Sequence, residues 1–124
     1  MLNILSFTRR SDLTFCRSGR IYISARVVRI LGLNSGDSIN ITCQDGEFLI
    51  FAVSALKNPA GANVAACRPS NKKGMHFYCN CTKLAKAMLR IANVKTDRVS
   101  FYVGYPTLLN GTKALPIITK NPIV

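Results

Sequence analysis

Basic side chains recur along two segments at the spacing of one helix face. Lys83, Lys86 and Arg90 follow i, i+3 and i+7, while Arg26 and Arg29 are three residues apart. Residues at these spacings share one side of a helix, and mobile Lys and Arg side chains readily contact phosphate. With the turns included, the candidate phosphate-binding residues are Arg17, Arg20, Arg26, Arg29, Arg68, Lys72, Lys73, Lys83, Lys86 and Arg90. The alternative is that these side chains only solvate exposed surfaces.

The net charge favours an acidic partner. The 124 residues carry 17 Lys and Arg against 5 Asp and Glu, which gives a net charge of +12. Residues 1–54 hold six basic and four acidic residues, net +2, whereas residues 55–124 hold eleven and one, net +10. Nucleic acid is therefore the first candidate partner, ahead of an anionic membrane and an acidic protein. The second half should contribute more of the contact surface.

Five cysteines and one histidine supply the remaining reactive or metal-binding chemistry. The cysteine number is odd, and the first residues lack the features of a secretory signal, so we expect free thiols in a reducing cytoplasm. Cys79 and Cys81 lie near His76, but only one residue separates them, whereas zinc ligand pairs usually have about two to four residues between them. The alternation along this segment suggests strand packing, and we expect no metal and no cofactor.

The five acidic residues are poorly distributed for catalysis. Most enzymes gather acid, base or nucleophilic groups in a cleft, whereas three of these acids lie in predicted turns. Asp37 and Asp97 occupy matching turns, where capping of the turn is the expected role. The chain contains neither a Walker loop nor a Gly-x-Gly-x-x-Gly motif. We expect no enzymatic activity.

Two segments of the chain share one order of predicted elements. Residues 21–23 and 77–79 are predicted strands, and each is followed by a short helix, a turn with an aspartate and a further strand. This order predicts an internal repeat, with copy one over residues 8–53 and copy two over residues 62–120. Residues 54–61, which are rich in small residues and include Pro59 and Gly61, are the predicted linker.

Local signals place helices and turns inside each copy. Ser24 and Asn80 are both good N-cap types, and they predict helices over 25–31 and from about 81 to about 92. The second helix would be about one turn longer. Asp45-Gly46 between two apolar runs predicts a hairpin, whereas residues 104–113 are predicted to form a long loop. The last residues, 116–124, are compatible with a strand, an arm or disorder.

The size of each copy argues for a shared core. A unit of about 50 residues with one short helix would leave much apolar surface exposed. The hydrophobic fraction of 48% predicts a folded chain, and no apolar run approaches the roughly 20 residues needed to cross a membrane. We therefore expect one domain over residues 1–124, with strands of both copies completing one barrel and no membrane association.

Residues 19–41 resemble the AbrB/MazE/SpoVT-like swapped-hairpin family of transition-state regulators and antitoxins. The shared pattern is a Gly-Arg pair before a strand, a Leu-Gly-apolar end to a short basic helix, and Gly-Asp before the next strand: Gly19-Arg20, Leu31-Gly32-Leu33 and Gly36-Asp37. The resemblance covers about residues 13–53, and it reaches residues 64–118 only through the internal repeat. Ser24 replaces the family's proline, Val28 replaces a frequent helix arginine, and the second copy has Met75-His76 in place of Gly-Arg.

The resemblance implies an interlaced barrel that binds duplex DNA, with Arg20 and Arg29 at the family's basic positions. For this chain it implies a fold that is mostly β with two short helices, namely a swapped-hairpin-like barrel formed by two internal repeats. Such a chain is an intrachain pseudo-dimer that could still form a homodimer. The implied function is that of a DNA-binding transcription regulator or an antitoxin-like protein.

A protein-interaction or assembly module with the same barrel fold and no DNA binding is the competing hypothesis. We expect Phe101, Tyr102 and Tyr105 to be exposed and to serve such a contact, and an acidic protein would match the charge. Tyr22 and Tyr78 occupy the same strand position in the two copies and could stack on bases. Aromatic residues beside a core strand are, however, more often packing residues.

Overall fold

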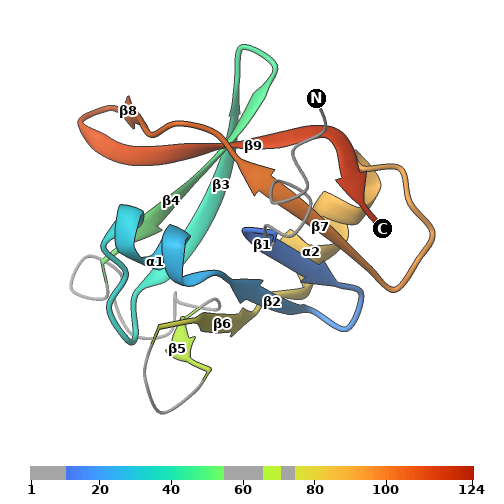
Figure 1. Cartoon of the computed structure of the whole chain (residues 1–124), viewed down its shortest axis with the longest axis horizontal. Helices are drawn as coiled ribbons and strands as arrows, with labels where there is room; N and C mark the ends of the chain where they lie inside the picture. Colours follow the sequence, from blue (N-terminus) through green and yellow to red (C-terminus); the bar gives the residue numbers. More distant parts are fainter. Residues whose placement is uncertain (1–10, 55–65, 71–74) are drawn as a thin grey trace, which may run out of the picture.

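The computed structural model describes residues 11–54, 66–70 and 75–124. Strands dominate these residues, and two helices accompany them (Figure 1). In chain order the elements are β1 (Leu13–Cys16), β2 (Arg20–Ile23), α1 (Ala25–Leu31), β3 (Ser38–Gln44), β4 (Glu47–Val53), β5 (Arg68–Pro69), β6 (Phe77–Asn80), α2 (Thr82–Ile91), β7 (Arg98–Val103), β8 (Thr107–Leu109) and β9 (Thr112–Ile123).

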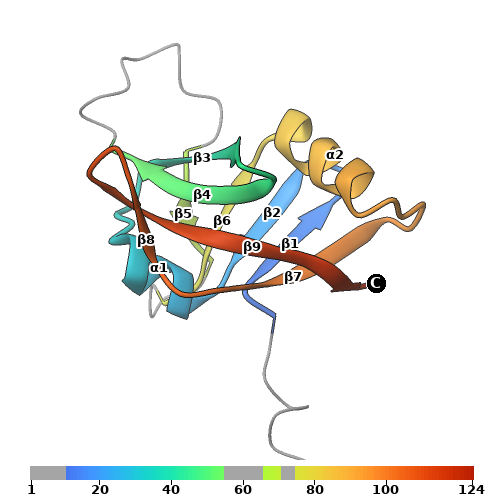
Figure 2. The ribbon, with the colours of Figure 1, turned by 90° about the horizontal axis from the view of Figure 1, so that it is seen from above.

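The strands form one antiparallel sheet that curls into a half-barrel (Figure 2). Their order across the sheet is β3-β4-β9-β7-β1-β2-β6-β5, and β8 pairs with β9. Strands from the two halves of the chain alternate in this order, since β1 and β2 lie between β7 and β6. The open edges approach each other at an isolated bridge between Ser38 and Ala66. The predicted barrel is thus a half-barrel, because the edge strand β5 has only two residues and its Pro69 has no N–H to donate to a ladder.

One face of the strands and one side of each helix build the core. Alternation buries Leu13 and Phe15 of β1, and the corresponding residues of β2, β6 and β7 point to the same side. The Phe15 and Phe101 rings meet edge to face with centroids 5.8 Å apart, which joins the two halves of the chain. The expectation that Phe101 is exposed is therefore wrong, because the alternation of β7 turns its side chain into the core. Helix α2 covers this face with Ala85, Met88 and Leu89, and it contacts β1, β2 and β7. Each large apolar side chain buried here contributes about 1.5–3 kcal/mol.

The two helices begin differently. Ser24 caps α1 as predicted, because its Oγ accepts a hydrogen bond from the Val27 N–H at 3.4 Å. The prediction for Asn80 is wrong: the N-cap of α2 is Cys81, which makes no side-chain cap bond. The Asn80 side chain accepts a hydrogen bond from Arg20 instead, at 2.9 Å. Helix α2 has ten residues against seven in α1, which agrees with the predicted extra turn.

The turn predictions succeeded once and failed once. Asp45 and Gly46 have φ angles of 52° and 82° and connect β3 to β4, as a two-residue hairpin requires. The loop predicted over residues 104–113 is wrong, since β8 lies within it and pairs with β9 through Asn110-Gly111. These two residues have φ angles of 52° and 82° as well, so they make the same kind of turn. Strand β9 continues to Ile123, which settles the end of the chain as a strand.

Some predictions fall on residues that the structure does not describe. Of the predicted linker 54–61, only Ser54 is described, and Lys72 and Lys73 also lie outside the described residues. Neither α1 nor α2, the helices of the described residues, is long and apolar enough to cross a membrane.

Candidate functional site

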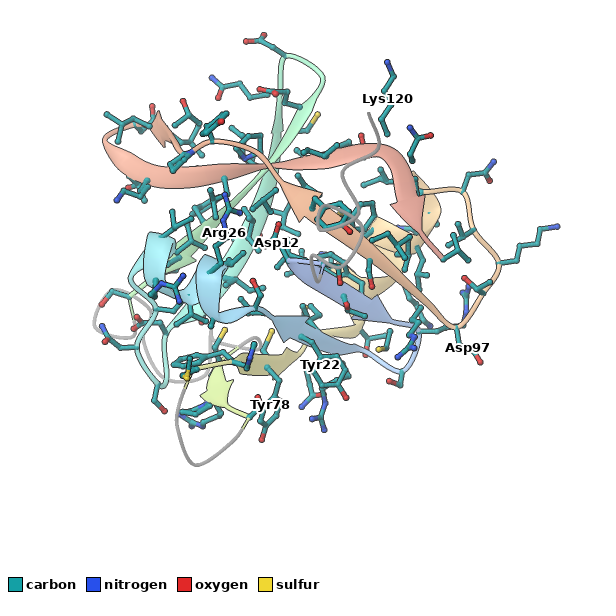
Figure 3. The ribbon with its side chains drawn as sticks, in the orientation of Figure 1. Asp12, Tyr22, Arg26, Tyr78, Asp97 and Lys120 are labelled. Atoms are coloured by element: carbon teal, nitrogen blue, oxygen red, sulfur yellow. The ribbon has the colours of Figure 1, made fainter. Side chains whose placement is uncertain are left out.

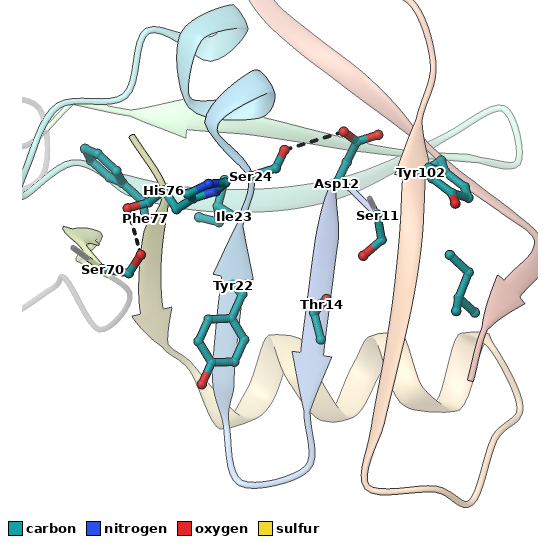
Figure 4. Close-up of a pocket in the computed structure, with 11 residues that line it drawn as sticks. Ser11, Asp12, Thr14, Tyr22, Ile23, Ser24, Ser70, His76, Phe77 and Tyr102 are labelled. Atoms are coloured by element: carbon teal, nitrogen blue, oxygen red, sulfur yellow. Dashed lines mark hydrogen bonds between the residues drawn. The ribbon is translucent and has the colours of Figure 1, made fainter. Parts of the chain in front are cut away.

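The face of β6, β2, β1 and β7 that points away from the core carries no helix. Figure 4 shows α2 behind this part of the sheet, with Tyr22, Thr14 and Tyr102 in front of it. We call this surface the open face. It consists of the outward residues of β5, β6, β2, β1 and β7: Arg68, Tyr78, Asn80, Arg20, Tyr22, Thr14, Cys16, Arg98, Ser100 and Tyr102.

Strand register aligns six outward side chains in one row across the open face. Residues that are direct partners on neighbouring antiparallel strands point to the same side of a sheet. The row therefore runs through Arg68, Tyr78, Tyr22, Thr14, Ser100 and Ile123. Thr14 Oγ1 and Ser100 Oγ, in the middle of the row, share a hydrogen bond of 2.8 Å. A second row, one step along the strands, contains Asn80 beside Arg20 and Cys16 beside Arg98.

Arg20 lies over one tyrosine and near a second on this face. Its guanidinium carbon lies 4.4 Å from the centroid of the Tyr78 ring and 6.0 Å from that of Tyr22. Its Nε donates to Asn80 Oδ1 at 2.9 Å, which fixes the plane of the guanidinium. Figure 3 shows Tyr22 and Tyr78 next to each other on neighbouring strands. Cation–π attraction and the hydrogen bond to the Asn80 side chain thus orient a positive charge that is only partly buried.

A groove of about 640 Å³ crosses the open face beside Tyr22 (Figure 4). Tyr22 and Tyr102 line it from the two sides, with Thr14 between them, and His76 and Ile123 also contribute to its wall. The side chain of Tyr22 is 46% exposed, so much of its ring is open to a ligand. The lining mixes an aromatic ring with hydroxyl groups, which suits a flat, partly polar group.

Asp12 lies at the end of the groove near α1, where its carboxylate accepts hydrogen bonds and pairs with an arginine. Its Oδ2 accepts from the Val103 N–H at 2.9 Å and lies 3.5 Å from Nη1 of Arg26. Its Oδ1 accepts from Ser24 Oγ at 3.4 Å. Figure 3 shows Arg26 and Asp12 pointing toward each other. Arg26, a predicted phosphate-binding residue, is thus paired with a buried carboxylate, which also offsets the negative charge beside the groove.

The structure divides the predicted basic residues among several surfaces. Arg20 and Arg68 lie on the open face, and Arg29 is exposed on the last turn of α1. Arg17 lies in the turn between β1 and β2, where its Nη2 donates to the main-chain oxygen of Thr96 at 2.8 Å.

Helix α2 carries the other basic residues that the structure describes. Lys83, Lys86 and Arg90 are all exposed on its outer side. Because α2 packs on the core side of the sheet, these three lie on the opposite side from the open face. The structure thus does not bring the predicted set together into one surface.

Sequence reasoning missed one group of residues on the open face and noticed another. Arg98, Thr14 and Ser100 carry no local signal, because their meeting depends on the pairing of β1 with β7, 86 residues apart for the Thr14–Ser100 bond. Tyr22 and Tyr78 were noticed as a repeated position, and the structure leaves Tyr22 46% exposed and Tyr78 partly buried. Their shared offset was the one signal available in the sequence.

Gly19, before Arg20, has a physical reason to be glycine. Its φ is +107°, and a Cβ at this position would lie 2.7 Å from Thr82 Oγ1. The turn between β1 and β2 therefore rests directly on the first turn of α2, where the Cys81 N–H also donates to the Gly19 carbonyl at 2.8 Å. The close approach fixes where β2 begins and hence where Arg20 emerges.

The histidine and two of the cysteines make contacts inside the fold. Within the described residues, Cys16, Cys43, Cys67, Cys79 and Cys81 form no disulfide. His76 Nδ1 accepts a hydrogen bond from the Ala25 N–H at 3.2 Å, which ties the start of β6 to α1. A hydrogen bond with Cys67 and burial raise the pKa of Cys79 far above the usual range, so its thiol stays protonated. Within the described ranges, no three His, Cys, Asp or Glu side chains gather as a metal site would require.

Comparison with known proteins gives no match: no protein-family model matches this chain, and neither does any curated protein or solved structure.

Proposed function

We propose that the protein binds nucleic acid, DNA in the first place, through the open face of its sheet. The observation that carries the proposal is the position of Arg20, an oriented guanidinium over Tyr78 and near Tyr22 on a face that no helix covers. Arg68 and Arg98 extend the positive charge along the two rows of this face. Phosphate contacts of this kind supply most of the affinity of nucleic-acid-binding proteins.

Charge complementarity supports a polyanion as the ligand. The two rows contain three arginines and no acidic residue among their described members, and the nearby Asp12 is paired with Arg26. The net charge of +12 adds long-range attraction to any polyanion. The role of a transcription regulator or antitoxin-like protein follows from the family resemblance, and it is the narrower form of the same proposal.

We also propose that the two halves of the chain are repeats of one unit. Tyr22 pairs with Tyr78, and the neighbouring pairs are Ile21 with Cys79 and Ile23 with Phe77. This register is symmetric about the tyrosine pair, as two copies related by a twofold axis would require. A pseudo-twofold axis between Tyr22 and Tyr78 would put the centre of the pseudo-dimer on the open face.

Matching backbone hydrogen bonds support the repeat. The Arg17 N–H donates to the Asp97 carbonyl and the Cys67 N–H to the Asp37 carbonyl, both at 2.7 Å, so each half supports the aspartate turn of the other. Both helices also end alike: Leu33 N–H donates to Val28 O, and Val94 N–H donates to Leu89 O. Such crossed contacts are those of the proposed swapped-hairpin arrangement.

Fluorescence anisotropy with labelled oligonucleotides of about 20 nucleotides tests the binding proposal, since this length covers site sizes of about 4–16 nucleotides. A random-sequence duplex and a single strand would be titrated over a salt series. We expect micromolar or tighter binding to at least one of them. The binding should weaken steeply as salt rises, because each phosphate that an arginine neutralises releases a counterion from the nucleic acid. No binding to either probe at low salt would refute the proposal.

Two triple variants of equal charge assign the binding to a surface. One replaces Arg20, Arg68 and Arg98 by alanine on the open face, and the other replaces Lys83, Lys86 and Arg90 by alanine on α2. Both reduce the net charge from +12 by three, to +9. We expect the first variant to lose most of its affinity and the second to lose little. The reverse order would move the proposed interface to α2.

Exposed apolar side chains near the β8–β9 hairpin favour the assembly module as a second candidate. Tyr105 is 89% and Leu108 71% exposed there. Large apolar side chains exposed close together commonly mark protein contacts. Light scattering of the wild type and of Leu108→Lys tests this candidate, which predicts a homodimer that the substitution dissociates.

A further inference from the structure

We propose that the open face binds single-stranded nucleic acid, with an unpaired base stacked on Tyr22 in the groove and the adjoining phosphates held by Arg20 and its neighbours. This inference rests on the proposed nucleic-acid binding and specifies the form of the ligand. It goes beyond the duplex DNA that the sequence suggests.

The tyrosines provide the first argument. Tyr22, on β2, is 46% exposed. Its partner on β6, Tyr78, is already covered by the Arg20 guanidinium. An exposed ring on a sheet surface offers a π face, and a planar guanidinium beside it offers a second stacking surface. Bases in a duplex have both faces stacked on their neighbours, so only an unpaired base can use these surfaces.

The groove provides the second argument. The groove has a volume of about 640 Å³. Tyr22 lines it, and so do Thr14 and Ser24, which carry hydroxyl groups. Ser24 and Asp12 are joined by a hydrogen bond, and Arg26 lies against the Asp12 carboxylate, so the wall beside α1 is polar without excess negative charge. A space of this shape accepts a flat heterocycle edge-on, whereas the rigid cylinder of a duplex rests on a surface and leaves such a groove empty.

The placement of charge provides the third argument. Arg68 and Tyr78 are direct partners, as are Tyr22 and Tyr78, while Arg20 precedes Tyr22 by two residues on the same face. Positive groups therefore lie next to aromatic rings, both along β2 and across from β5 to β6. Single-strand sites combine these two elements, since phosphates and bases alternate along an extended strand.

The test compares one sequence in three forms: single-stranded DNA, single-stranded RNA and duplex DNA, each labelled and titrated by anisotropy at one moderate salt concentration. We expect at least one single strand to bind tenfold or more tightly than the duplex. The DNA and RNA arms identify which sugar the site prefers. Tenfold or tighter binding of either single strand relative to the duplex supports the inference.

The Tyr22→Ala variant identifies the stacking surface. Loss of one base–aromatic stack should weaken single-strand binding about 5- to 150-fold, and Tyr22→Phe should retain it. Tyr105→Ala is the matched control, because Tyr105 is 89% exposed and lies outside the open face. The chain has no tryptophan and four tyrosines, so quenching of tyrosine emission on binding reports stacking directly, and the quench should shrink in Tyr22→Ala.

The outcomes separate this inference from the function on which it rests. Duplex binding equal to or tighter than single-strand binding, or unchanged single-strand affinity in Tyr22→Ala, would overturn the inference and leave nucleic-acid binding standing. Absence of binding to all three probes would overturn both. Because Tyr22 points away from the core, a melting curve close to that of the wild type should verify that Tyr22→Ala is folded.

Discussion

Arg20 combines charge with a fixed plane. Its guanidinium carbon lies 4.4 Å from the Tyr78 ring centroid, and its Nε donates a hydrogen bond to Asn80. Both interactions depend on the flat guanidinium group. A lysine at this position would keep the charge and lose the plane, so the two contributions can be separated by substitution.

We expect Arg20→Lys to bind nucleic acid about tenfold more weakly than the wild type, which corresponds to about 1.4 kcal/mol. The reason is that an ammonium group cannot stack flat on Tyr78 or present two parallel donors to a phosphate. Anisotropy titrations measure the change, with Arg90→Lys on α2 as a control for the same exchange on the opposite side from the open face. Equal affinity of Arg20→Lys and wild type would show that charge alone matters.

Cys79 couples stability to alkaline pH. The hydrogen bond with Cys67 and burial hold its pKa far above the ordinary 9.0, whereas in the unfolded chain the thiol ionises near that value. Well below pH 9.0 both states keep the proton and this group adds no pH dependence. Above it, the folded state binds more protons than the unfolded state, so the free energy of unfolding falls as pH rises.

We expect the wild type to lose about 1.4 kcal/mol more stability than Cys79→Ala per pH unit above the thiol's ordinary pKa. Urea unfolding under reducing conditions, at several pH values on each side of that point, gives both curves. The alanine variant also loses packing and starts lower, but the slope is the quantity compared. Parallel curves for the two proteins would contradict a protonated, buried Cys79.

At the scale of single elements, the hydroxyl group of Ser24 contributes to the start of α1 beside the contact from His76. Ser24 Oγ accepts from Val27 N–H and donates to Asp12 Oδ1, so it caps the helix and links it to β1. We expect Ser24→Ala to lower the free energy of unfolding by about 1 kcal/mol, a usual value for loss of an N-cap. Thermal or urea melts measure it, with Ser18→Ala in an exposed turn as the control. A loss no larger than in Ser18→Ala would argue against the cap.

The turn between β1 and β2 requires glycine for two reasons that can be measured separately. Gly19→Ala should destabilise the protein by about 1–3 kcal/mol, because a Cβ there is strained at φ +107° and meets Thr82 Oγ1 at 2.7 Å. Gly46→Ala, at φ +82° with open space around it, isolates the cost of the backbone angle. The Thr82→Ala change should recover part of the loss in Gly19→Ala. Equal losses in Gly19→Ala and Gly46→Ala would leave no role for the contact with α2.

At the scale of the whole molecule, neither half of the chain has a core of its own. Strands β1 and β2 lie between β7 and β6, and Phe15 packs edge to face on Phe101 from the other half. Unfolding one half would therefore expose the core face of the other and leave its central strands unpaired. Cooperativity across the halves is a direct consequence of this interleaved order.

We expect a single unfolding transition, with far-UV circular dichroism and tyrosine fluorescence giving the same midpoint. Phe101→Ala should lower the stability of the whole chain by about 3–5 kcal/mol, since it leaves a cavity opposite Phe15. Both probes should shift together in this variant. A biphasic curve, or a shift seen by one probe only, would indicate that the halves unfold independently.

The sequence by itself determined the elements that depend on near neighbours. The helix over residues 25–31, its Ser24 cap and the Asp45-Gly46 turn are confirmed, because periodicity, capping and turn chemistry act within a few residues. The same chemistry was present in Asn110-Gly111, whose hairpin was missed inside an apparent loop.

Only the tertiary structure decided what those elements are used for. It directed Asn80 to Arg20 instead of the start of α2, paired Arg26 with Asp12, and separated Lys86 and its neighbours from the open face. Each of these outcomes depends on strand register and on which side of the sheet a helix covers. Register and sidedness are set by packing between residues distant in the chain, and a pattern read along one segment carries no information about them.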